Sequence, residues 1–387
     1  MFASSNKFSV LQKQQIELGK INHVNTDIYA DKNLSELMMS SCRIALEDGA
    51  SEESVKFLLD KYKKKEISEE TFYTLIKRGI YLFNIKELKE KYRPPLPKHT
   101  GYIIKSNRSD AFIGGVFGDI IGSPLEGTMY HHTLTIKEMM KKKTTFTDDT
   151  ILMIATKKVL DEKKVIGYRD ELSLNDFKIA NTYPYISNPF TDMYRTYGRK
   201  YKDAGFGEKF YHWLRTNSKE PYGSYGNGSA MRVGVIADYF DLDKVMEYSI
   251  ASAATTHNHV DGIKGAVVIS VICWMAKNGY TKDEILDYMK QFYSLETSRK
   301  YAMPHIKSFD YKGFSETMGM EVCQYTVPMA VFCFYNSNSF EDAINNGLTL
   351  IGDIDTICSI TGAIAGSYYG IPDYIRKYTI KKINRII

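Results

Sequence analysis

The sequence has few cysteines, and no spacing between them marks a cross-link or a thiolate metal site. The five cysteines are an odd number, and none belongs to a C-x-x-C pair. This argues against a disulfide framework and against a zinc site built from cysteines, and it favours a reducing compartment. We therefore expect a cytoplasmic protein.

Long apolar runs are also missing. No stretch approaches about 18 uninterrupted apolar residues, so no membrane-spanning helix is expected. The opening segment, MFASSNKFSVLQKQQ, lacks the apolar centre of a signal peptide. The net charge of +5 is too small to indicate nucleic acid as a partner. We expect neither a membrane nor a specific nucleic acid among the partners.

Strand patterns are scarce, whereas glycine recurs at helical spacing. Regular apolar-polar alternation is hard to find, so few strands are expected. The recurring glycines are Gly114, Gly118 and Gly122 in one segment and Gly362, Gly366 and Gly370 in another. Glycine weakens a helix interior by about 1 kcal/mol per site, so its repeated use needs a reason. The stripes predict helices whose backbones pack closely in a compact all-α fold.

The first residues have the pattern of a separate helical segment. Val55, Leu58 and Leu59 form an apolar helix stripe, and Ser68 before Phe72 is typical of a second helix start. The segment RPPLPKH then has three prolines that cannot continue a helix. We predict a helical extension over residues 1–92, a linker over residues 93–100 and a main domain over residues 101–387.

Two segments place carboxylates and a threonine directly before an apolar helix. They are FTDDT, with Thr147, Asp148 and Asp149, and GDIDT, with Asp353, Asp355 and Thr356. Either segment alone is also explained as a helix N-cap. Together they supply four carboxylates and two hydroxyls, the ligand set of a hard cation such as Mg²⁺ or Mn²⁺. Because four carboxylates in one place repel unless they are neutralised, two divalent ions are the simplest expectation.

Two further segments could contact a ligand. In PYGSYGNGSAMR, glycines allow backbone amides to approach phosphate, with a helix expected near Ser229, although a flexible turn also explains the pattern. In TTHNH, His257 and His259 do not share a helix face, which argues against a paired zinc site. A ligand-contacting histidine and a capping or core histidine both remain open.

Taken in chain order, the segments GDIIGSPLEG, FTDDT, GSYGNGSAMR, TTHNH and GDIDTICSITGAIAG, with GFG at Gly205, resemble the ADP-ribosylglycohydrolases of the dinitrogenase-reductase-activating type. The resemblance spans roughly Asp110 to Ile371. It implies a compact all-α catalytic domain that cleaves the glycosidic bond between ADP-ribose and a protein side chain, with arginine favoured. It also implies a binuclear Mg²⁺ centre, with Mn²⁺ as the alternative. The implied metal ligands are Thr147, Asp148, Asp149, Asp353, Asp355 and Thr356.

The resemblance also implies the roles of single residues toward ADP-ribose or an ADP-ribosylated protein. Glu126 matches a glutamate that gates the site or helps activate water, and Asp353 is the other candidate to accept the proton. The implied substrate-binding residues are Ser224, Tyr225, Gly226, Asn227, Gly228 and His257, around the diphosphate and the adenosine.

Residues 1–92 lie outside the resemblance. Some members with N-terminal additions are antidotes to ADP-ribosylating toxins, which implies immunity as a role and an ADP-ribosyltransferase toxin as a partner of residues 1–92. One alternative is a binding protein that occludes a partner through this extension. A regulatory or dimerisation segment and an unrelated two-metal phosphodiesterase are further alternatives.

Overall fold

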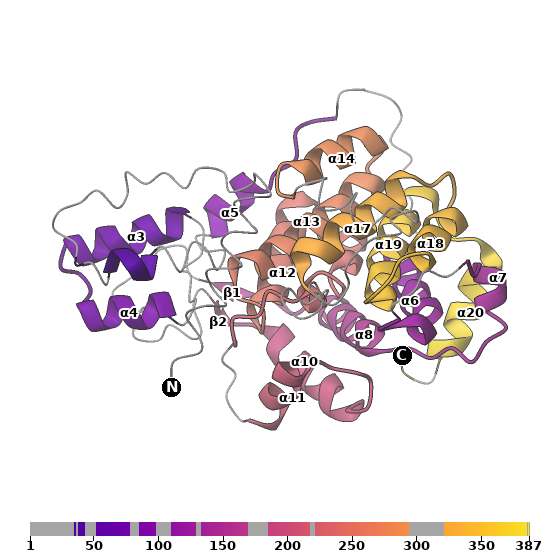
Figure 1. Ribbon diagram of the computed structural model, residues 1–387, viewed down its shortest axis with the longest axis horizontal. Helices are drawn as coiled ribbons and strands as arrows, with labels where there is room; N and C mark the ends of the chain where they lie inside the picture. Colours follow the sequence, from indigo (N-terminus) through magenta and orange to yellow (C-terminus); the bar gives the residue numbers. More distant parts are fainter. Residues whose placement is uncertain are drawn as a thin grey trace. The chain divides into compact units, whose positions relative to one another are not determined.

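The protein is described here as a computed structural model, and Figure 1 shows its helices. The structure describes residues 35, 38–42, 52–77, 85–97, 110–128, 133–168, 185–216, 221–293, 321–384 and 386. The chain divides into two compact units, residues 1–77 and residues 78–387. The predicted all-α class is confirmed, because the described residues are mainly helical. Strands β1 (Gly167–Tyr168) and β2 (Tyr185–Ser187) form a short antiparallel pair.

The first unit contains the two helices expected from the sequence. Helix α3 (Glu52–Lys63) buries Val55, Leu58 and Leu59, the predicted apolar stripe. Helix α4 (Glu69–Lys77) begins directly after Ser68, whose hydroxyl accepts the backbone N–H of Thr71 at 3.1 Å. A hydroxyl acceptor before the first turn satisfies an N–H that the helix itself cannot pair.

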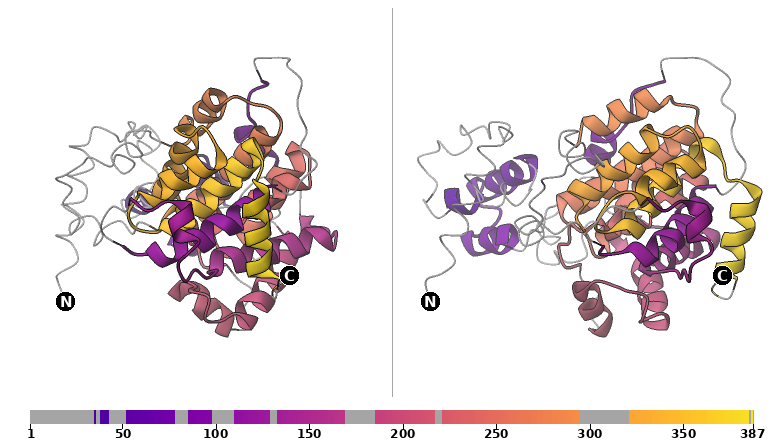
Figure 2. Two further views of the ribbon diagram at one scale, coloured as in Figure 1. Left: turned by 90° about the vertical axis from the view of Figure 1, so that its right-hand side faces the viewer. Right: turned by 45° about the vertical axis from the view of Figure 1, so that its right-hand side comes forward.

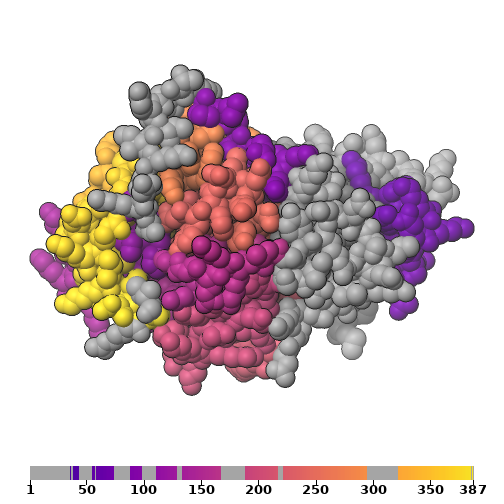
Figure 3. All heavy atoms as spheres, turned by 180° about the vertical axis from the view of Figure 1, so that it is seen from behind, coloured from indigo at the N-terminus to yellow at the C-terminus, as the bar shows by residue number. Residues whose placement is uncertain are grey.

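The second unit holds the remaining described helices, and Figure 2 shows it from two further sides. In chain order they are α5 (Ile85–Lys91), α6 (Asp110–Gly122), η2 (Ser123–Leu125), α7 (Ile136–Met139), α8 (Asp148–Asp161), α10 (Pro189–Lys200), α11 (Glu208–Arg215), η3 (Asn227–Ser229), η4 (Gly234–Asp238), α12 (Leu242–Ala254), α13 (Val260–Lys277), α14 (Lys282–Lys290), α17 (Cys323–Tyr335), α18 (Phe340–Leu348), α19 (Ile354–Tyr369) and α20 (Asp373–Ile383). In the view from behind, the pink atoms of α10 and α11 form the lower edge of this unit (Figure 3).

The segment after α5 is hydrogen-bonded to tyrosines near α14 within the second unit. The hydroxyl of Tyr288 donates to the carbonyl of Tyr92 at 2.7 Å, and the hydroxyl of Tyr280 donates to the carbonyl of Pro95 at 3.0 Å. The predicted division into an extension, a linker and a main domain at residues 92 and 100 stays a prediction.

Helices α6 and α19 meet backbone to backbone at the centre of the second unit. A Cβ atom at Gly118 would lie 2.0 Å from the carbonyl oxygen of Cys358, and one at Gly114 would lie 2.1 Å from that of Gly362. Real Cβ atoms do not approach so closely, so only glycine fits. The close packing predicted from the glycine spacing is confirmed. Gly370 differs from the other stripe positions: with φ of 77° it ends α19 and takes no part in the contact.

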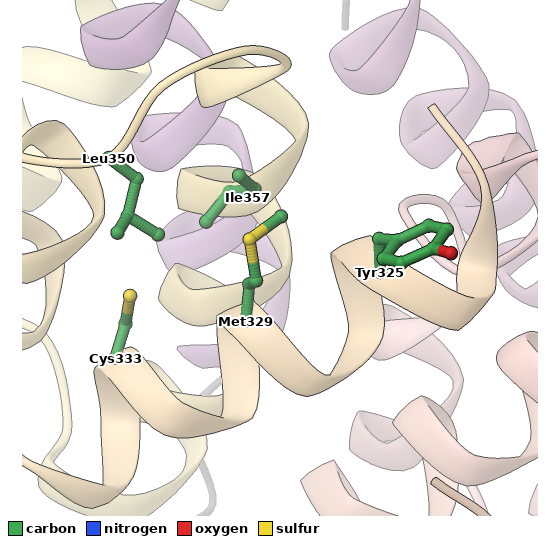
Figure 4. Close-up of a cluster of buried hydrophobic side chains, with 5 residues drawn as sticks. All are labelled: Tyr325, Met329, Cys333, Leu350 and Ile357. Carbon is green, nitrogen blue, oxygen red and sulfur yellow. The ribbon is translucent and has the colours of Figure 1, made fainter. Parts of the chain in front are cut away.

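Helix α17 packs along α19 through a small apolar cluster. Met329 and Cys333 on α17 point toward Ile357 on α19 and toward Leu350, while Tyr325 lies one turn further along α17 (Figure 4). These five side chains are at most 9% exposed. The first turn of α19, which carries Asp355 and Thr356, is therefore packed between α6 and α17.

Disulfides and membrane-spanning helices are both missing from the described part of the chain. All five cysteines are free and buried, as expected for a chain without disulfides. Among the described residues, no helix combines the length and apolar character that a membrane span requires.

Candidate active site

A cavity of about 360 Å³ lies where the N-terminal ends of α8 and α19 meet residues 221–229, the glycine-rich loop. The predicted site residues that line it are Glu126, Asp148, Asp149, Ser224, Gly226, Asn227, Gly228, His257, Asp353, Asp355 and Thr356. Thr147 and Tyr225 are predicted site residues that do not line it. Segments far apart in the sequence thus converge on one space large enough for a small ligand.

Asp119 on α6 holds the first of the acidic segments. Its carboxylate accepts the backbone N–H of Thr147 at 3.0 Å and the Thr147 hydroxyl at 2.7 Å. It also accepts the N–H of Thr150 at 3.1 Å and, in a short hydrogen bond, the Thr150 hydroxyl. The side chain is fully buried. Four donors on one buried carboxylate fix the start of α8, and with it Asp148 and Asp149, against α6.

Thr147 has two structural contacts that bear on its predicted role as a ligand. Its hydroxyl donates to Asp119 and accepts the N–H of Asp149 at 3.4 Å, as the N-cap of α8. The cap interpretation of FTDDT therefore describes Thr147 itself. Ligation by Thr147 stays a prediction.

The second acidic segment is tied to the first by a direct hydrogen bond. The Thr356 hydroxyl donates to Asp149 Oδ2 at 3.1 Å, joining residues 207 positions apart in the sequence. Asp353 is held separately, because Asn227 Nδ2 donates to its Oδ2 at 2.5 Å. Both acidic clusters thereby face the same cavity.

Two buried carboxylate oxygens in this cluster have no partner within the described part of the chain. They are Asp149 Oδ1 and Asp355 Oδ1, and each residue is 2% exposed. Burial, and then the carboxylate of Asp119, raises the pKa of Asp149 well above its usual range. Burial, and then Asp353, does the same to the pKa of Asp355. An unpaired buried carboxylate is costly unless a cation or a donor compensates it.

These groups fit divalent cations by their chemistry, since all are oxygen donors of negative charge. Among the described residues, no three histidine, cysteine, aspartate or glutamate side chains already surround one common point. The second oxygens of Asp149 and Asp353 accept hydrogen bonds from the Thr356 hydroxyl and from Asn227 Nδ2. By the chemistry of their donor atoms, these residues suit the divalent cations that the sequence predicts.

Glu126 lies at the cavity on the segment that follows η2. Burial, and then the charge of Asp353, raises its pKa. The next residues are hydrogen-bonded to the segment before Asp353: Gly127 N–H donates to the carbonyl of Gly352 at 2.9 Å, and Gly352 N–H donates to that of Thr128 at 3.0 Å. Glu126 and Asp353 are therefore held by one pair of backbone segments.

The glycine-rich loop is paired with the segment that precedes α17. Asn227 N–H donates to the carbonyl of Glu321 at 2.8 Å, and Cys323 N–H donates to that of Tyr225 at 3.2 Å. The prediction of a helix that begins near Ser229 was wrong, because only the three-residue 3₁₀ turn η3 forms there. The Ser229 hydroxyl is instead used in the interior, where it donates to the carbonyl of Gly262 at 2.8 Å.

Tyr225 lies outside the cavity lining. Its side chain is exposed, and its ring centroid lies 5.1 Å from that of His259. Its predicted contact with adenosine stays a prediction.

The two histidines take different positions, which the sequence left open. His259 is the N-cap of α13, and its Nδ1 accepts the N–H of Asp261 at 3.1 Å. His257 lines the cavity and is 6% exposed. Burial, and then the charge of Arg232, lowers the pKa of His257 well below its usual value. The ring is therefore neutral near pH 7.

Sequence reasoning missed several cavity residues. They are Glu208, Lys209, Phe210, Tyr222, Met231, Arg232 and Glu321. It also missed Asp119, which lies behind the cavity. One signal was available for Asp119: a carboxylate among the glycines and apolar residues of a buried helix needs a dedicated partner.

The fold and the cavity can be compared with known protein families. Residues 104–384 match the family described as ADP-ribosylglycohydrolase, and the chain belongs to that family.

The chain is similar to "ADP-ribosylhydrolase ARH3" of Xenopus tropicalis, with 26% identity over 67% of this chain and 86% of that protein. The human protein of that name is 22% identical over 67% of this chain and 84% of its own length. A solved structure, "ADP-ribosylglycohydrolase-related protein complex", is 20% identical, covers 73% of this chain and 99% of its own, and has a TM-score of 0.48.

Proposed function

We propose that this chain is a metal-dependent hydrolase that cleaves the glycosidic bond between ADP-ribose and a protein side chain. The observation that carries the proposal is the cavity in which the unpartnered oxygens of Asp149 and Asp355 meet Glu126 and the glycine-rich loop. Family membership supports the class of reaction.

The proposed cofactor is a pair of Mg²⁺ ions, with Mn²⁺ as the alternative. The residues that would hold them are Thr147, Asp148, Asp149, Asp353, Asp355 and Thr356. When bound, such ions acidify water and fix hydroxyls of a sugar. Neutralisation of the crowded carboxylates by cations supports this assignment.

The chain's own residues would orient the substrate and move a proton. Glu126 is proposed to accept the proton of the attacking water, a role that its raised pKa supports because the carboxyl group then titrates nearer to neutral pH. Asp353 is the alternative base. The loop from Ser224 to Gly228 is proposed to bind the diphosphate beside His257. It would do so through groups other than the N–H groups of Ser224, Gly226 and Asn227, which donate to the Thr256 carbonyl, to the Ser224 hydroxyl and to the Glu321 carbonyl. Tyr225 is proposed to contact the adenosine.

Arginine is the proposed acceptor side chain. The carboxylates of Glu126 and Glu321 both line the cavity, and each has a raised pKa caused by burial and then by Asp353. Two carboxylates beside the reacting bond favour a cationic leaving group such as a guanidinium, because each unit charge attracts the other.

The direct test is release of ADP-ribose from defined peptides that carry ADP-ribosyl-arginine or ADP-ribosyl-serine. We expect release with Mg²⁺ or Mn²⁺, at least about tenfold faster from the arginine peptide, and none with excess EDTA. Release that persists at full rate in EDTA would contradict the metal requirement. Preference for serine would overturn only the choice of acceptor.

Immunity is a second candidate role, and it concerns the N-terminal unit. Residues 1–77 form a compact unit of their own, and the family match begins only at residue 104. We propose that this extension binds an ADP-ribosyltransferase toxin, either to occlude it or to bring the hydrolase to its products.

Deletion of residues 1–77 tests this role. The shortened chain should keep its peptide hydrolase activity within about twofold, because the cavity belongs to the second unit. It should lose protection of cells that express an ADP-ribosylating toxin. Protection that survives the deletion but ends with Glu126→Ala would exclude occlusion.

A further inference from the structure

Arg232 is a buried cation that the proposed reaction does not use. It is the largest fully buried side chain among the described residues, with 0% exposure. No carboxylate in the described part of the chain forms an ion pair with it. Its guanidinium lies 4.4 Å from the centre of the Tyr194 ring, a favourable contact for a cation. A desolvated charge of this kind needs a structural reason.

Arg232 donates hydrogen bonds to the segment from Ser252 to Thr256, including longer ones of 3.4 Å to the hydroxyls of Ser252 and Thr255. Its Nη2 donates to the carbonyl of Ser252 at 2.7 Å and to Thr256 Oγ1 at 3.0 Å. Since arginine can only donate, the Thr256 oxygen is the acceptor in this contact. The hydroxyl still carries its proton and a second lone pair for a further partner.

The ring of His257 is within hydrogen-bond distance of this hydroxyl. Thr256 Oγ1 and His257 Nδ1 are 2.7 Å apart. A threonine that accepts from Arg232 and donates to Nδ1 makes Nδ1 the unprotonated ring nitrogen. In a neutral ring the proton is then on Nε2. Tyr222 also hydrogen-bonds Thr256, and the arrangement requires that the Tyr222 hydroxyl donates to Thr256 instead of competing for its proton.

Nε2 of His257 faces the glycine-rich loop. A Cβ atom at Gly228 would lie 3.2 Å from it, and a Cβ atom at Gly226 would lie 3.5 Å away. His257, Gly226 and Gly228 all line the cavity. The ring therefore presents Nε2 where the loop's backbone would receive a ligand.

We propose that Arg232 and Thr256 are positioning residues that hold His257 as its Nε2–H tautomer, so that His257 donates a hydrogen bond to an oxygen of the bound ligand. A histidine fixed in this way cannot accept a proton at Nε2, which leaves general-base chemistry to the carboxylates. The ligand class, a molecule with diphosphate or hydroxyl oxygens, rests on the proposed function. The tautomer itself does not.

The tautomer can be measured in the free protein by long-range ¹H–¹⁵N NMR on a sample labelled only at histidine. There are 8 histidines, and a His257→Gln variant assigns the signal. We expect Nδ1 to resonate as an unprotonated nitrogen and Nε2 as a protonated one. A protonated Nδ1 in the free wild-type protein would overturn the inference, whatever the protein hydrolyses.

Thr256→Val tests the relay, because it removes the hydroxyl at nearly constant volume. We expect the Nε2–H signature to be lost and binding of ADP-ribose to weaken by about tenfold, the effect of one misdirected hydrogen bond. Thr256→Ser should restore both.

Thr255→Val is the matched control. Thr255 is the adjacent buried threonine; its hydroxyl donates to the carbonyl of Ser252 at 2.8 Å and accepts from Arg232 Nη2 at 3.4 Å, so the control removes a contact of the same guanidinium without touching the histidine ring. It should leave the tautomer unchanged. An unchanged tautomer in Thr256→Val would refute the relay. Failure of wild-type protein to bind ADP-ribose would instead refute the proposed function and leave the tautomer result standing.

Discussion

Asp149→Asn should abolish hydrolysis while making the metal-free protein more stable. The carboxylate is buried, one of its oxygens has no partner within the described residues, and neighbouring carboxylates surround it. We expect kcat/KM for ADP-ribose release to fall by at least about 1,000-fold, as when a principal electrostatic group of an active site is removed. Asp355→Asn should behave in the same way, because Asp355 supplies the matching oxygen from α19.

The stability change should have the opposite sign because a buried charge is removed. Burial raises the pKa of Asp149 in the folded protein above its value in the unfolded chain. The metal-free wild type therefore loses stability as pH rises from about 4 toward neutral, where the carboxylate ionises. Asp149→Asn should flatten this dependence and add about 1 kcal/mol to the free energy of unfolding at pH 7.

Urea denaturation and thermal melts, with and without Mg²⁺, measure both effects. Wild type should melt at a higher temperature with Mg²⁺, and Asp149→Asn should not. Asp161→Asn is the control on the same helix, since Asp161 pairs with Lys157 at 2.8 Å on the surface and lies at the other end of α8. It should keep full activity. Metal-stimulated hydrolysis by Asp149→Asn at the wild-type rate would sink the assignment.

Gly118→Ala should be the most damaging single substitution in the core of the second unit. The added Cβ would lie 2.0 Å from the carbonyl oxygen of Cys358, which is backbone and cannot rotate away. Overpacking a core costs about 1–3 kcal/mol where side chains can adjust. Here two helices must separate, so we expect a loss of at least about 3 kcal/mol in the free energy of unfolding.

Helix propensity alone predicts the opposite sign for this substitution. Alanine is favoured over glycine in a helix interior by about 1 kcal/mol, so Gly118→Ala would stabilise an isolated helix. Gly207→Ala is the control, because an added Cβ there meets no atom within 4 Å. Gly207 is the N-cap of α11, where alanine is less favourable than glycine, so we expect a loss of less than about 1 kcal/mol. If Gly118→Ala unfolds in urea at the same concentration as the wild type, the prediction is contradicted and the two helices can separate at little cost.

Features encoded locally were readable from the sequence. The spacing of Gly114 and Gly118 marked the helix contact, and the order Thr147, Asp148, Asp149 marked a helix start. Each signal lies in the residue itself or in its chain neighbours: glycine lacks a Cβ, and threonine has a hydroxyl that can cap a helix.

Features that depend on distant partners were not readable. Asp119 acts on Thr147 and Thr150 from another helix, and nothing in its own segment indicates them. The absence of a helix at Ser229 has the same origin, since Ser229 bonds to the carbonyl of Gly262 in a different element. Such contacts form only after the helices have packed, so tertiary structure overrides the local pattern.

Two backbone hydrogen bonds that join Gly127 and Thr128 to Gly352 connect the segments that carry Glu126 and Asp353. Glu126 directly precedes Gly127 in this bridge, and Asp353 directly follows Gly352. The Glu126 segment cannot swing outward unless both bonds break or Gly352 moves with it. A displacement of the Glu126 segment that keeps these bonds would also displace Gly352, which directly precedes Asp353, so the two carboxylates share one backbone support.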